Sequence, residues 1–453
     1  MTTDERRRLR DHPRGLWVLA GTELWDRISY HGMQALLVLY MAGELLLPGH
    51  VENIGGFAGY RAAVEVVTGP LSVQALAAQT FGLYTAFIYF TPVIGGWIGD
   101  RWTGRRVAVA GGALLMTAGH FALALEATFL VALLLLILGA GLLRGNLSAQ
   151  VKSLYADGDP READAFQLYY VAINLGAFIA PIVTGALAAI YGWHFAFGFA
   201  GFGMLIGLVV YLVGQRHLPA DAARVAAVAR SRLTTEERRR LWGLAIVWVF
   251  LIGFWIAQSQ VWNVYNLWVR DHLDLAVGGF VVPVPWLQAL DGLAPVLTLP
   301  LFLALWRRQA ARGSEPDDVG KLAIGCTIFA LGVLWLAAAQ WVSGTDDRAP
   351  LLWAVAFHLI TNVGWLYVAP IAVALFAAKS PAGLRGTLLG VNLLSLFFAS
   401  IVSGRIGGFY ETLPPADFWL LHAAIVGGSG LGLAVLARPL RRLFAGDAEA
   451  AVR

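Results

Sequence analysis

Long runs of apolar residues alternate with short polar stretches along almost the whole chain. A helix needs about 20 mostly apolar residues to cross the hydrocarbon core of a bilayer, and twelve runs meet this length. The pattern predicts an all-α polytopic membrane protein whose spans form two groups of six. The first group lies near residues 15–41, 77–99, 107–126, 129–151, 165–190 and 194–214. The second group lies near residues 241–267, 285–306, 320–342, 350–378, 385–410 and 417–437.

The longest charged stretch of the chain separates these two groups and is predicted to be a cytoplasmic surface linker. Within it, Thr234 or Thr235 is a suitable cap for a short helix, because Glu236 and Glu237 follow in the first turn. The predicted domains are an N-terminal six-helix bundle over 1–215, the linker over 216–240 and a C-terminal six-helix bundle over 241–453.

Composition supports lipid as the solvent for much of the chain. Hydrophobic residues make up 58% of the sequence and charged residues 14%, whereas soluble domains carry roughly 25% charged residues. The single cysteine, Cys326, allows no intramolecular disulfide and no cysteine metal cluster. The sequence also contains no zinc-ligand cluster, nucleophile elbow or phosphate loop, so we expect neither an enzyme nor a bound cofactor or metal.

Positive charge is concentrated in alternate loops, which indicates membrane orientation rather than nucleic-acid binding, although the net charge is +4. We therefore expect both termini on the cytoplasmic side of a plasma membrane, most simply a bacterial inner membrane. The loop over 42–76 would then face outside, with a short amphipathic helix around Tyr60–Val67. The clusters that carry this prediction are Arg6–Arg14, Arg101–Arg106, Arg307–Arg312, Lys379–Arg385 and Arg438–Arg442.

The first predicted span contains a stripe of polar residues. Glu23, Asp26, Arg27 and Tyr30 stand at positions i, i+3, i+4 and i+7, so they share one face of a helix. This face would oppose insertion if it met lipid, and we expect it to line the bundle interior or a wet cavity. Carboxylates beside an arginine can exchange protons as their surroundings dry or open. The alternative is a static buried ion pair that fixes helix packing.

This stripe resembles the E-x-x-E-R-F-x-Y-Y signature of the proton-dependent oligopeptide transporters, a branch of the major facilitator superfamily. Asp26 replaces the second glutamate, Ile28 the phenylalanine and His31 the last tyrosine. The resemblance implies the superfamily fold of twelve helices in two six-helix bundles. It also implies proton coupling by Glu23, Asp26 and Arg27, and a substrate site lined by Arg27 and Tyr30.

The junction after the second span, Gly95–Arg106, resembles a loop motif shared across the same superfamily. Asp100, Arg101, Arg105 and Arg106 are expected to form a cytoplasmic charge latch that takes part in gating.

Two further stretches in the first half resemble family motifs. The fourth span is similar to G-L-x-K-P-N-x-S, with Arg144 in the lysine position and Asn146 retained. An arginine inside a span needs a partner, which would be a substrate carboxylate or an acidic side chain. The fifth span is similar to F-Y-x-x-I-N-x-G, and its Tyr170 and Asn174 share a helix face. The resemblance implies that Arg144, Asn146, Tyr170 and Asn174 meet the substrate.

The second half departs further from the family. Ser259 occupies a position where the family commonly has an acid, beside the retained Gln260. In the eighth span Gln288 is retained, while Asp291 replaces an asparagine. The resemblance implies that Gln260 and Gln288 meet the substrate. Asp291 is therefore a candidate for proton coupling and substrate binding, or else a hydrogen-bond partner within the bundle.

The tenth and eleventh spans depart most. Trp365 stands where the family pattern G-E-x-x-x-S-P has the acid that holds a peptide amino terminus, and Asn392 stands where an aromatic residue is frequent. We expect both to meet the substrate. Trp365 would stack on an apolar or cyclic group, or hold a cation over its face.

These observations predict a monomeric proton-coupled symporter that imports di-/tripeptides or peptide-like substrates by alternating access. It would need no cofactor besides the proton gradient and would bind no nucleic acid. One alternative is a carrier of a modified peptide or another small organic anion. Another is a membrane receptor that does not transport.

Overall fold

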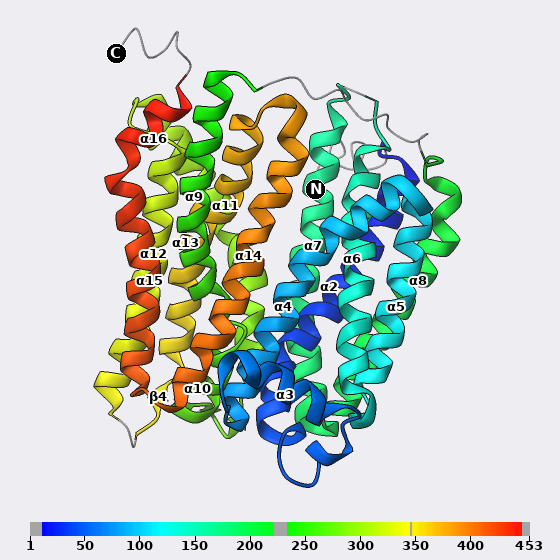
Figure 1. Ribbon diagram of the computed structural model, residues 1–453, viewed down its shortest axis with the longest axis vertical. Helices are drawn as coiled ribbons and strands as arrows, with labels where there is room; N and C mark the ends of the chain where they lie inside the picture. Colours follow the sequence, from blue (N-terminus) through cyan, green and yellow to red (C-terminus); the bar gives the residue numbers. More distant parts are fainter. Residues whose placement is uncertain (1–10, 157, 222–232, 345–346, 446–453) are drawn as a thin grey trace. The chain divides into compact units, whose positions relative to one another are not determined.

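The computed structural model describes residues 11–156, 158–221, 233–344 and 347–445, and Figure 1 shows that they are almost entirely helical. A long helix lies at each predicted span, so the predicted all-α fold is confirmed. Residues 1–10 lie outside the described residues, and four of the arginines used to predict orientation are among them. The long helices are α2 (Arg14–Tyr40), α4 (Val73–Ile98), α5 (Arg105–Leu123), α6 (Phe129–Lys152), α7 (Arg161–Tyr191), α8 (Trp193–Gly214), α9 (Thr235–Gln260), α11 (Ala289–Ala311), α12 (Asp318–Ser343), α13 (Leu352–Lys379), α14 (Arg385–Gly407) and α15 (Pro415–Val435).

Short elements connect the long helices. The short α-helices are α3 (Phe57–Thr68), α10 (Val264–His272) and α16 (Ala437–Phe444), and α3 confirms the amphipathic helix predicted in the first loop. Strand β1 (Leu273–Asp274) pairs in parallel with β4 (Ala349–Pro350), and β2 (Ala276–Val277) pairs antiparallel with β3 (Phe280–Val281). Single turns of π- or 3-10 helix are η1 (Met41–Leu45), η2 (Val51–Asn53), η3 (Gly99–Thr103), η4 (Glu126–Thr128), η5 (Gln215–His217), η6 (Val284–Gln288), η7 (Ala382–Leu384) and η8 (Gly408–Glu411).

Eleven helical segments of the described residues are long and apolar enough to cross a membrane. Helix α2 is not among them, because every 18-residue stretch of it contains Glu23, Asp26 and Arg27. The predicted total of twelve spans and the orientation of the termini stay predictions.

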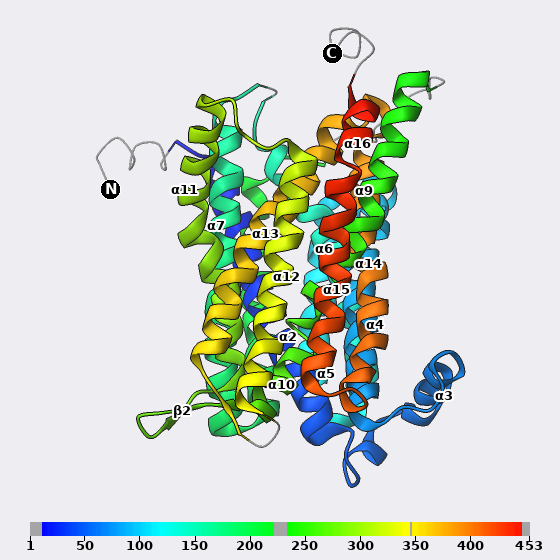
Figure 2. The same cartoon turned by 90° about the vertical axis from the view of Figure 1, so that its left-hand side faces the viewer.

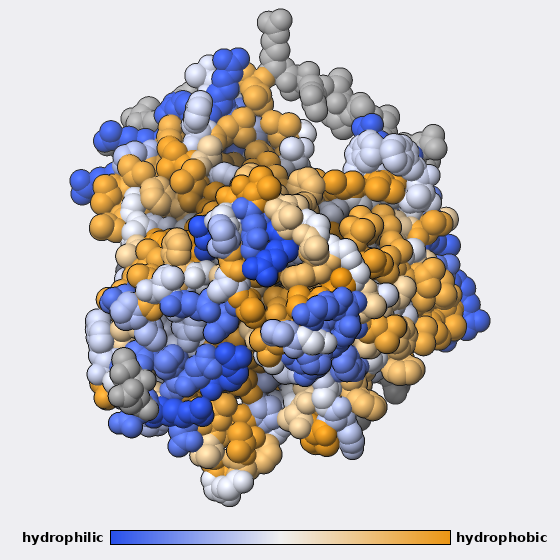
Figure 3. Space-filling model, turned by 60° about the horizontal axis from the view of Figure 1, so that its bottom comes forward, coloured by the Kyte–Doolittle hydropathy of each residue, from blue (hydrophilic) through white to orange (hydrophobic). Residues whose placement is uncertain are grey.

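Large apolar side chains remain exposed on these helices, among them Trp242, Leu301 and Val435. Figure 3 shows apolar residues gathered in broad orange patches beside polar ones. A soluble protein rarely exposes apolar patches of this extent, so these surfaces fit contact with lipid tails.

The chain divides into two compact units. Unit 1 comprises residues 1–69 and 87–226, and unit 2 comprises residues 70–86 and 227–453. Helix α4 contributes its first half to unit 2 and its second half to unit 1. The predicted domain limits at residues 215 and 241 stay a prediction.

In unit 1, helix α2 packs against α7 and α8, and α5 packs against α6 and α8. Glycines allow the closest of these approaches. A Cβ atom added to Gly176 of α7 would lie 2.5 Å from the Cβ atom of Arg27 on α2. One added to Gly95 of α4 would lie 2.1 Å from the carbonyl oxygen of Gly141 on α6. These contacts bring the polar face of α2 against α7 and bring α4 against α6.

In unit 2, helix α12 packs between α13 and α15, and α9 packs against α14 and α15; Figure 2 shows α12, α13 and α15 side by side. The first half of α4 belongs to this unit through a glycine crossing. A Cβ atom added to Gly82 would lie 2.6 Å from the carbonyl oxygen of Ser400 on α14.

The seventh helix corrects the prediction for the linker. Thr234 accepts a hydrogen bond from the backbone N–H of Glu237, whose side chain in turn accepts one from the Thr234 N–H. This capping box begins α9 itself, so no separate short helix is present at the described end of the linker. The cap predicted at Thr234 is thus confirmed, and residues 235–240 of the predicted linker are helical and form the beginning of α9.

The predicted span over 241–267 is interrupted, because α9 ends at Gln260 and α10 begins at Val264. Amide side chains satisfy backbone groups around this break, as an apolar medium requires. Gln288 donates to the carbonyl oxygen of Val261 at 2.5 Å and to Oδ1 of Asn266 at 2.7 Å. Gln260 donates to the carbonyl oxygen of Ser403 at 2.8 Å.

The crossing of α4 and α6 gives a stability prediction. The variant Gly95→Ala should lower the free energy of unfolding by about 1–3 kcal/mol, since its methyl group has no space against Gly141. Thermal denaturation of the purified protein in detergent measures the effect as a lower Tm. Gly111→Ala on α5 is the control, because a Cβ atom there meets nothing within 4 Å. An equal Tm for the two variants would contradict the crossing.

Candidate functional site

The polar stripe of α2 lies inside unit 1, as its spacing predicts. Glu23 is 2% exposed and Asp26 is fully buried. Arg27 donates through Nε to Oε1 of Glu23 at 2.7 Å, and its Nη2 lies 3.5 Å from Oδ2 of Asp26. One arginine thus contacts both carboxylates of the stripe.

Arg144 from α6 completes this cluster. It donates through Nε to Oδ2 of Asp26 at 3.1 Å and through Nη2 to Oδ1 at 3.3 Å, a two-pronged contact. Its guanidinium lies over the ring of Tyr30, 4.0 Å from the ring centre. The partner that an arginine inside a span requires is therefore Asp26, and two carboxylates face two guanidinium groups.

Tyr169 of α7 belongs to the cluster, although the sequence analysis chose its neighbour. The Tyr169 hydroxyl donates to Oε2 of Glu23 at 2.5 Å. Tyr170 is 40% exposed, and Asn174 donates to its carbonyl oxygen at 2.9 Å. In the structure, Gly176 lies seven residues after Tyr169 on the same helix face and approaches Arg27.

Asn146 lies at a helix contact one turn from Leu142. It is 1% exposed and donates to the carbonyl oxygen of Gly95 at 2.9 Å and to that of Leu142 at 2.8 Å. A Cβ atom on Gly99 would lie 2.0 Å from Oδ1 of Asn146. These contacts hold α6 against α4, and a role for Asn146 in substrate binding stays a prediction.

The predicted latch residues lie at the turn between α4 and α5. Arg105 donates through Nε to Oδ1 of Asp100 at 2.8 Å, and both side chains are partly exposed. Arg106 donates to the carbonyl oxygen of Leu218, and the guanidinium of Arg101 lies 5.8 Å from the ring centre of Trp97. The structure therefore joins Asp100 with Arg105, while the other two arginines have different partners among the described residues.

Unit 2 holds a second buried polar group. Oδ1 of Asp291 on α11 lies 2.7 Å from Nδ1 of His358 on α13, and Asn362 donates to the same oxygen at 2.9 Å. His358 was missed by the sequence analysis, although an ionisable residue inside an apolar span is a functional signal. The interpretation of Asp291 as a hydrogen-bond partner within the bundle is thus confirmed, and its role in coupling stays a prediction.

The other site residues predicted in unit 2 are separate from this pair. Gln288 donates to the carbonyl oxygen of Val261 at the break between α9 and α10, and Gln260 donates to that of Ser403 on α14. Trp365 on α13 is partly buried. Asn392 on α14 is 4% exposed, and its Oδ1 has no hydrogen-bond partner among the described residues.

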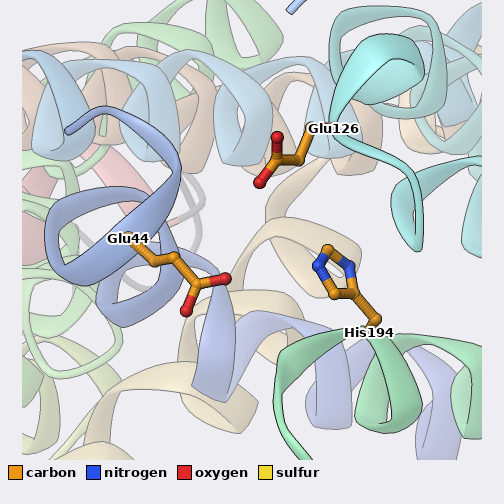
Figure 4. A group of neighbouring side chains, drawn as sticks. All are labelled: Glu44, Glu126 and His194. Carbon is orange, nitrogen blue, oxygen red and sulfur yellow. The ribbon is translucent and has the colours of Figure 1, made fainter. Parts of the chain in front are cut away.

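One group of side chains outside these clusters has metal-ligand chemistry. Glu44, Glu126 and His194 offer ligand atoms within 4.8 Å of one another, and Figure 4 shows them facing a common space. Glu126 already accepts hydrogen bonds from His50 at 2.5 Å and from Asn53 at 2.8 Å. The bond to Glu126 raises the pKa of His50 above its usual value. Hydrogen bonds thus satisfy Glu126 without a cation.

A charged cleft of about 870 Å³ lies at the end of unit 2 where α16 meets α12. Arg441 donates through Nε to Oδ2 of Asp317 at 2.6 Å across it. Burial acts to raise the pKa of Asp317, but Arg441 outweighs burial and holds this pKa below its usual value. Side chains of both charges line the cleft, among them Glu315, Asp318, Lys379 and Arg438.

Comparison with known proteins identifies the class. The chain is 26% identical to the peptide transporter YePEPT of Yersinia enterocolitica, over 96% of this chain and 95% of the relative. It is 26% identical to a di-/tripeptide transporter of Lactococcus lactis subsp. cremoris, over 95% and 96% of the two chains. The crystal structure of a peptide transporter POT in complex with sulfate matches with a TM-score of 0.85 and 26% identity, over 96% of each chain.

These matches confirm the predicted superfamily fold and a multi-pass membrane transporter rather than an enzyme. The model of the POT family matches residues 106–223 and 220–420. Since this match spans well over half of the sequence, the chain belongs to the POT family.

Proposed function

We propose that the chain is a proton-coupled symporter that imports di-/tripeptides or peptide-like substrates by alternating access. The observation that carries this proposal is the buried cluster of Glu23, Asp26, Arg27 and Arg144. Its two acids and two arginines are balanced when all four are ionised. Any further charge that enters must therefore be compensated.

This balance couples a proton to an anionic substrate. A substrate carboxylate that binds Arg27 or Arg144 brings one negative charge into the cluster. A guanidinium group suits this role because it can bind a carboxylate through two hydrogen bonds. One proton on Glu23 restores neutrality and removes the ionic part of its contact with Arg27. Binding of the proton thus favours binding of the substrate carboxylate, and the reverse also holds. The contact between Arg27 and Glu23 is the one that changes when the proton binds.

The remaining parts of the transport cycle follow the superfamily pattern, in which two helical halves rock around a central site. We propose that Asp100 and Arg105 form a latch that breaks and reforms during this cycle. Both termini are cytoplasmic in this proposal, and the protein works as a monomer in a bacterial inner membrane. The proton gradient is the only driving force, without a cofactor.

The cargo is proposed from the relatives and from Trp365. Two relatives are described as peptide transporters, one of them for di- and tripeptides, which supports short peptides as the substrate class. Trp365 offers an aromatic face and no charge for a free amine. A peptide whose amine is modified therefore fits this chain at least as well as an ordinary one.

Glu23→Gln tests the coupling. In proteoliposomes with a gradient of about one pH unit, loss of one coupled proton should lower accumulation about tenfold, or 1.4 kcal/mol. Exchange of labelled peptide without a gradient should remain, since glutamine keeps the shape of the site. Glu65→Gln is the matched control, because Glu65 pairs with Arg61 at the same spacing and 2.9 Å but outside the long helices. Full gradient-driven uptake by Glu23→Gln would remove Glu23 from the coupling.

Trp365→Glu tests the cargo. The native chain should take up an N-acetylated dipeptide at least as well as the free dipeptide. The glutamate should shift the preference toward the free amine by about tenfold, because a charge-assisted hydrogen bond is worth about 1.5–3 kcal/mol. Competition between the two labelled peptides measures the ratio, and Trp365→Phe should leave it near the native value. An unchanged preference in Trp365→Glu would place Trp365 away from the substrate amine.

A further inference from the structure

The pair formed by Asp291 and His358 is buried in unit 2 near the beginnings of α11 and α13. The His358 side chain is fully buried, and that of Asp291 is 17% exposed. Their 2.7 Å contact joins helices that are 67 residues apart in the sequence. Burying two ionisable residues inside apolar helices costs free energy, and such residues usually have a functional role.

The hydrogen bonds suit an ionised Asp291 beside a neutral His358. Oδ1 of Asp291 faces the amide nitrogen of Asn362, which only donates, and also faces Nδ1 of His358. A carboxylate oxygen can accept from both, and in that arrangement Nδ1 carries the imidazole proton. Asp291 also lies in the first turn of α11, where the helix dipole favours a negative charge.

The second ring nitrogen of His358 is left with a lone pair. Nε2 is buried and has no hydrogen-bond partner among the described residues. The ring of His358 meets the rings of Tyr265 and Phe357, with centres 5.2 and 5.3 Å apart. Since buried polar atoms are normally paired, this nitrogen calls for a specific explanation.

The charges near the pair do not balance it. In the described residues, Asp291 forms an ion pair with no arginine or lysine. Tyr265 of α10 is the titratable side chain whose ring meets His358. Titratable side chains on the helices that pack against α13 have other partners. On α12, Lys321 pairs with Glu315 and Cys326 packs against Gly430. On α9, Arg240 pairs with Glu236, and on α14, Arg405 lies over the ring of Phe409. The pair therefore has a net charge of −1 when His358 is neutral, in contrast to the balanced cluster of unit 1.

We propose that Asp291 and His358 together bind a second transported proton, separate from the one bound by the cluster of unit 1. This inference rests on the proposed function. The proton adds to the free lone pair of Nε2, no other bond breaks, and the imidazolium neutralises the carboxylate of Asp291. Release reverses the step.

The position of the pair suits loading during import. In the predicted orientation, the eighth and tenth spans both begin at the outer face, and Asp291 and His358 lie close to those beginnings. The Asp291 side chain is 17% exposed, whereas that of His358 is fully buried. His358 lies seven residues, or two turns, before Trp365 on the same face of α13. The pair thus supplies an acid to unit 2, which carries a tryptophan in place of the family's glutamate.

Proton stoichiometry tests the pair. The purified full chain in liposomes would transport labelled trialanine or N-acetyl-dialanine, whichever the native protein takes up faster. The proton-to-peptide ratio would be obtained from the membrane potential at which net flux reverses. His358→Gln and Asp291→Asn should each lower the ratio by about one proton, and the double variant should lower it no further, because the two residues act as one site.

The matched control is His422→Gln on α15. His422 is also fully buried with an unpartnered Nε2, but its Nδ1 bonds to the carbonyl oxygen of Phe418 and to no carboxylate. Its variant should keep the native ratio. Gradient-free exchange of the same peptide shows that each variant is folded, and Asp291→Asn introduces the family's own residue if His358→Gln does not fold.

The outcomes separate the two proposals. If neither peptide is exchanged by the native chain, the proposed function fails and not the pair alone. If the native chain transports and both variants keep its ratio, the second proton site is wrong. An equal loss in His422→Gln would also overturn it, because that effect would come from any buried histidine.

Discussion

Ionised side chains buried among apolar helices must be compensated by opposite charges, and this requirement shapes the centre of unit 1. The four ionised groups of unit 1 come from α2 and α6 and lie within 3.5 Å of a partner. None would be stable there alone, because lipid and apolar side chains solvate charge poorly. The close approach of α2 to α7 at Gly176 and of α4 to α6 at Gly95 belongs to the same unit, and such packing holds the charged side chains at contact distance.

The two units meet this constraint in different ways. Unit 1 balances two acids with two arginines, and in the proposed mechanism a proton restores the balance that an anionic substrate disturbs. Unit 2 places one carboxyl group beside one imidazole whose Nε2 has no hydrogen-bond partner among the described residues. The first arrangement suits coupling to a substrate carboxylate, and the second suits the binding of a proton by itself. A transporter with both has two places at which the gradient can act.

Residues that differ from the family pattern can be explained together with other residues that differ from it, rather than one by one. Asp26 takes the place of a glutamate, and Arg144 takes the place of a lysine. The Asp26 carboxylate accepts two hydrogen bonds from the Arg144 guanidinium. A shorter acid and a longer, forked base preserve the contact between α2 and α6. In unit 2, Asp291 replaces an asparagine, Trp365 replaces an acid, and Asp291 reaches α13 through His358 instead. Retained residues such as Asn146, Gln260 and Gln288 bond to the backbone at helix crossings and breaks.

The helices and the polar stripe of α2 could be predicted from local patterns of residues alone. Apolar length and the 3.6-residue period are local properties, so the predicted spans coincide with observed helices, and Glu23, Asp26, Arg27 and Tyr30 share a face as expected. Only the tertiary structure decided the partners across helices, namely Arg144 with Asp26, Tyr169 with Glu23 and His358 with Asp291. These pairs lie 118, 146 and 67 residues apart, and the rotation and depth at which two helices pack set which side chains meet. The break between α9 and α10 was hidden for the same reason, because the side chain of Gln288, 27 residues further along the chain, bonds to its backbone at Val261.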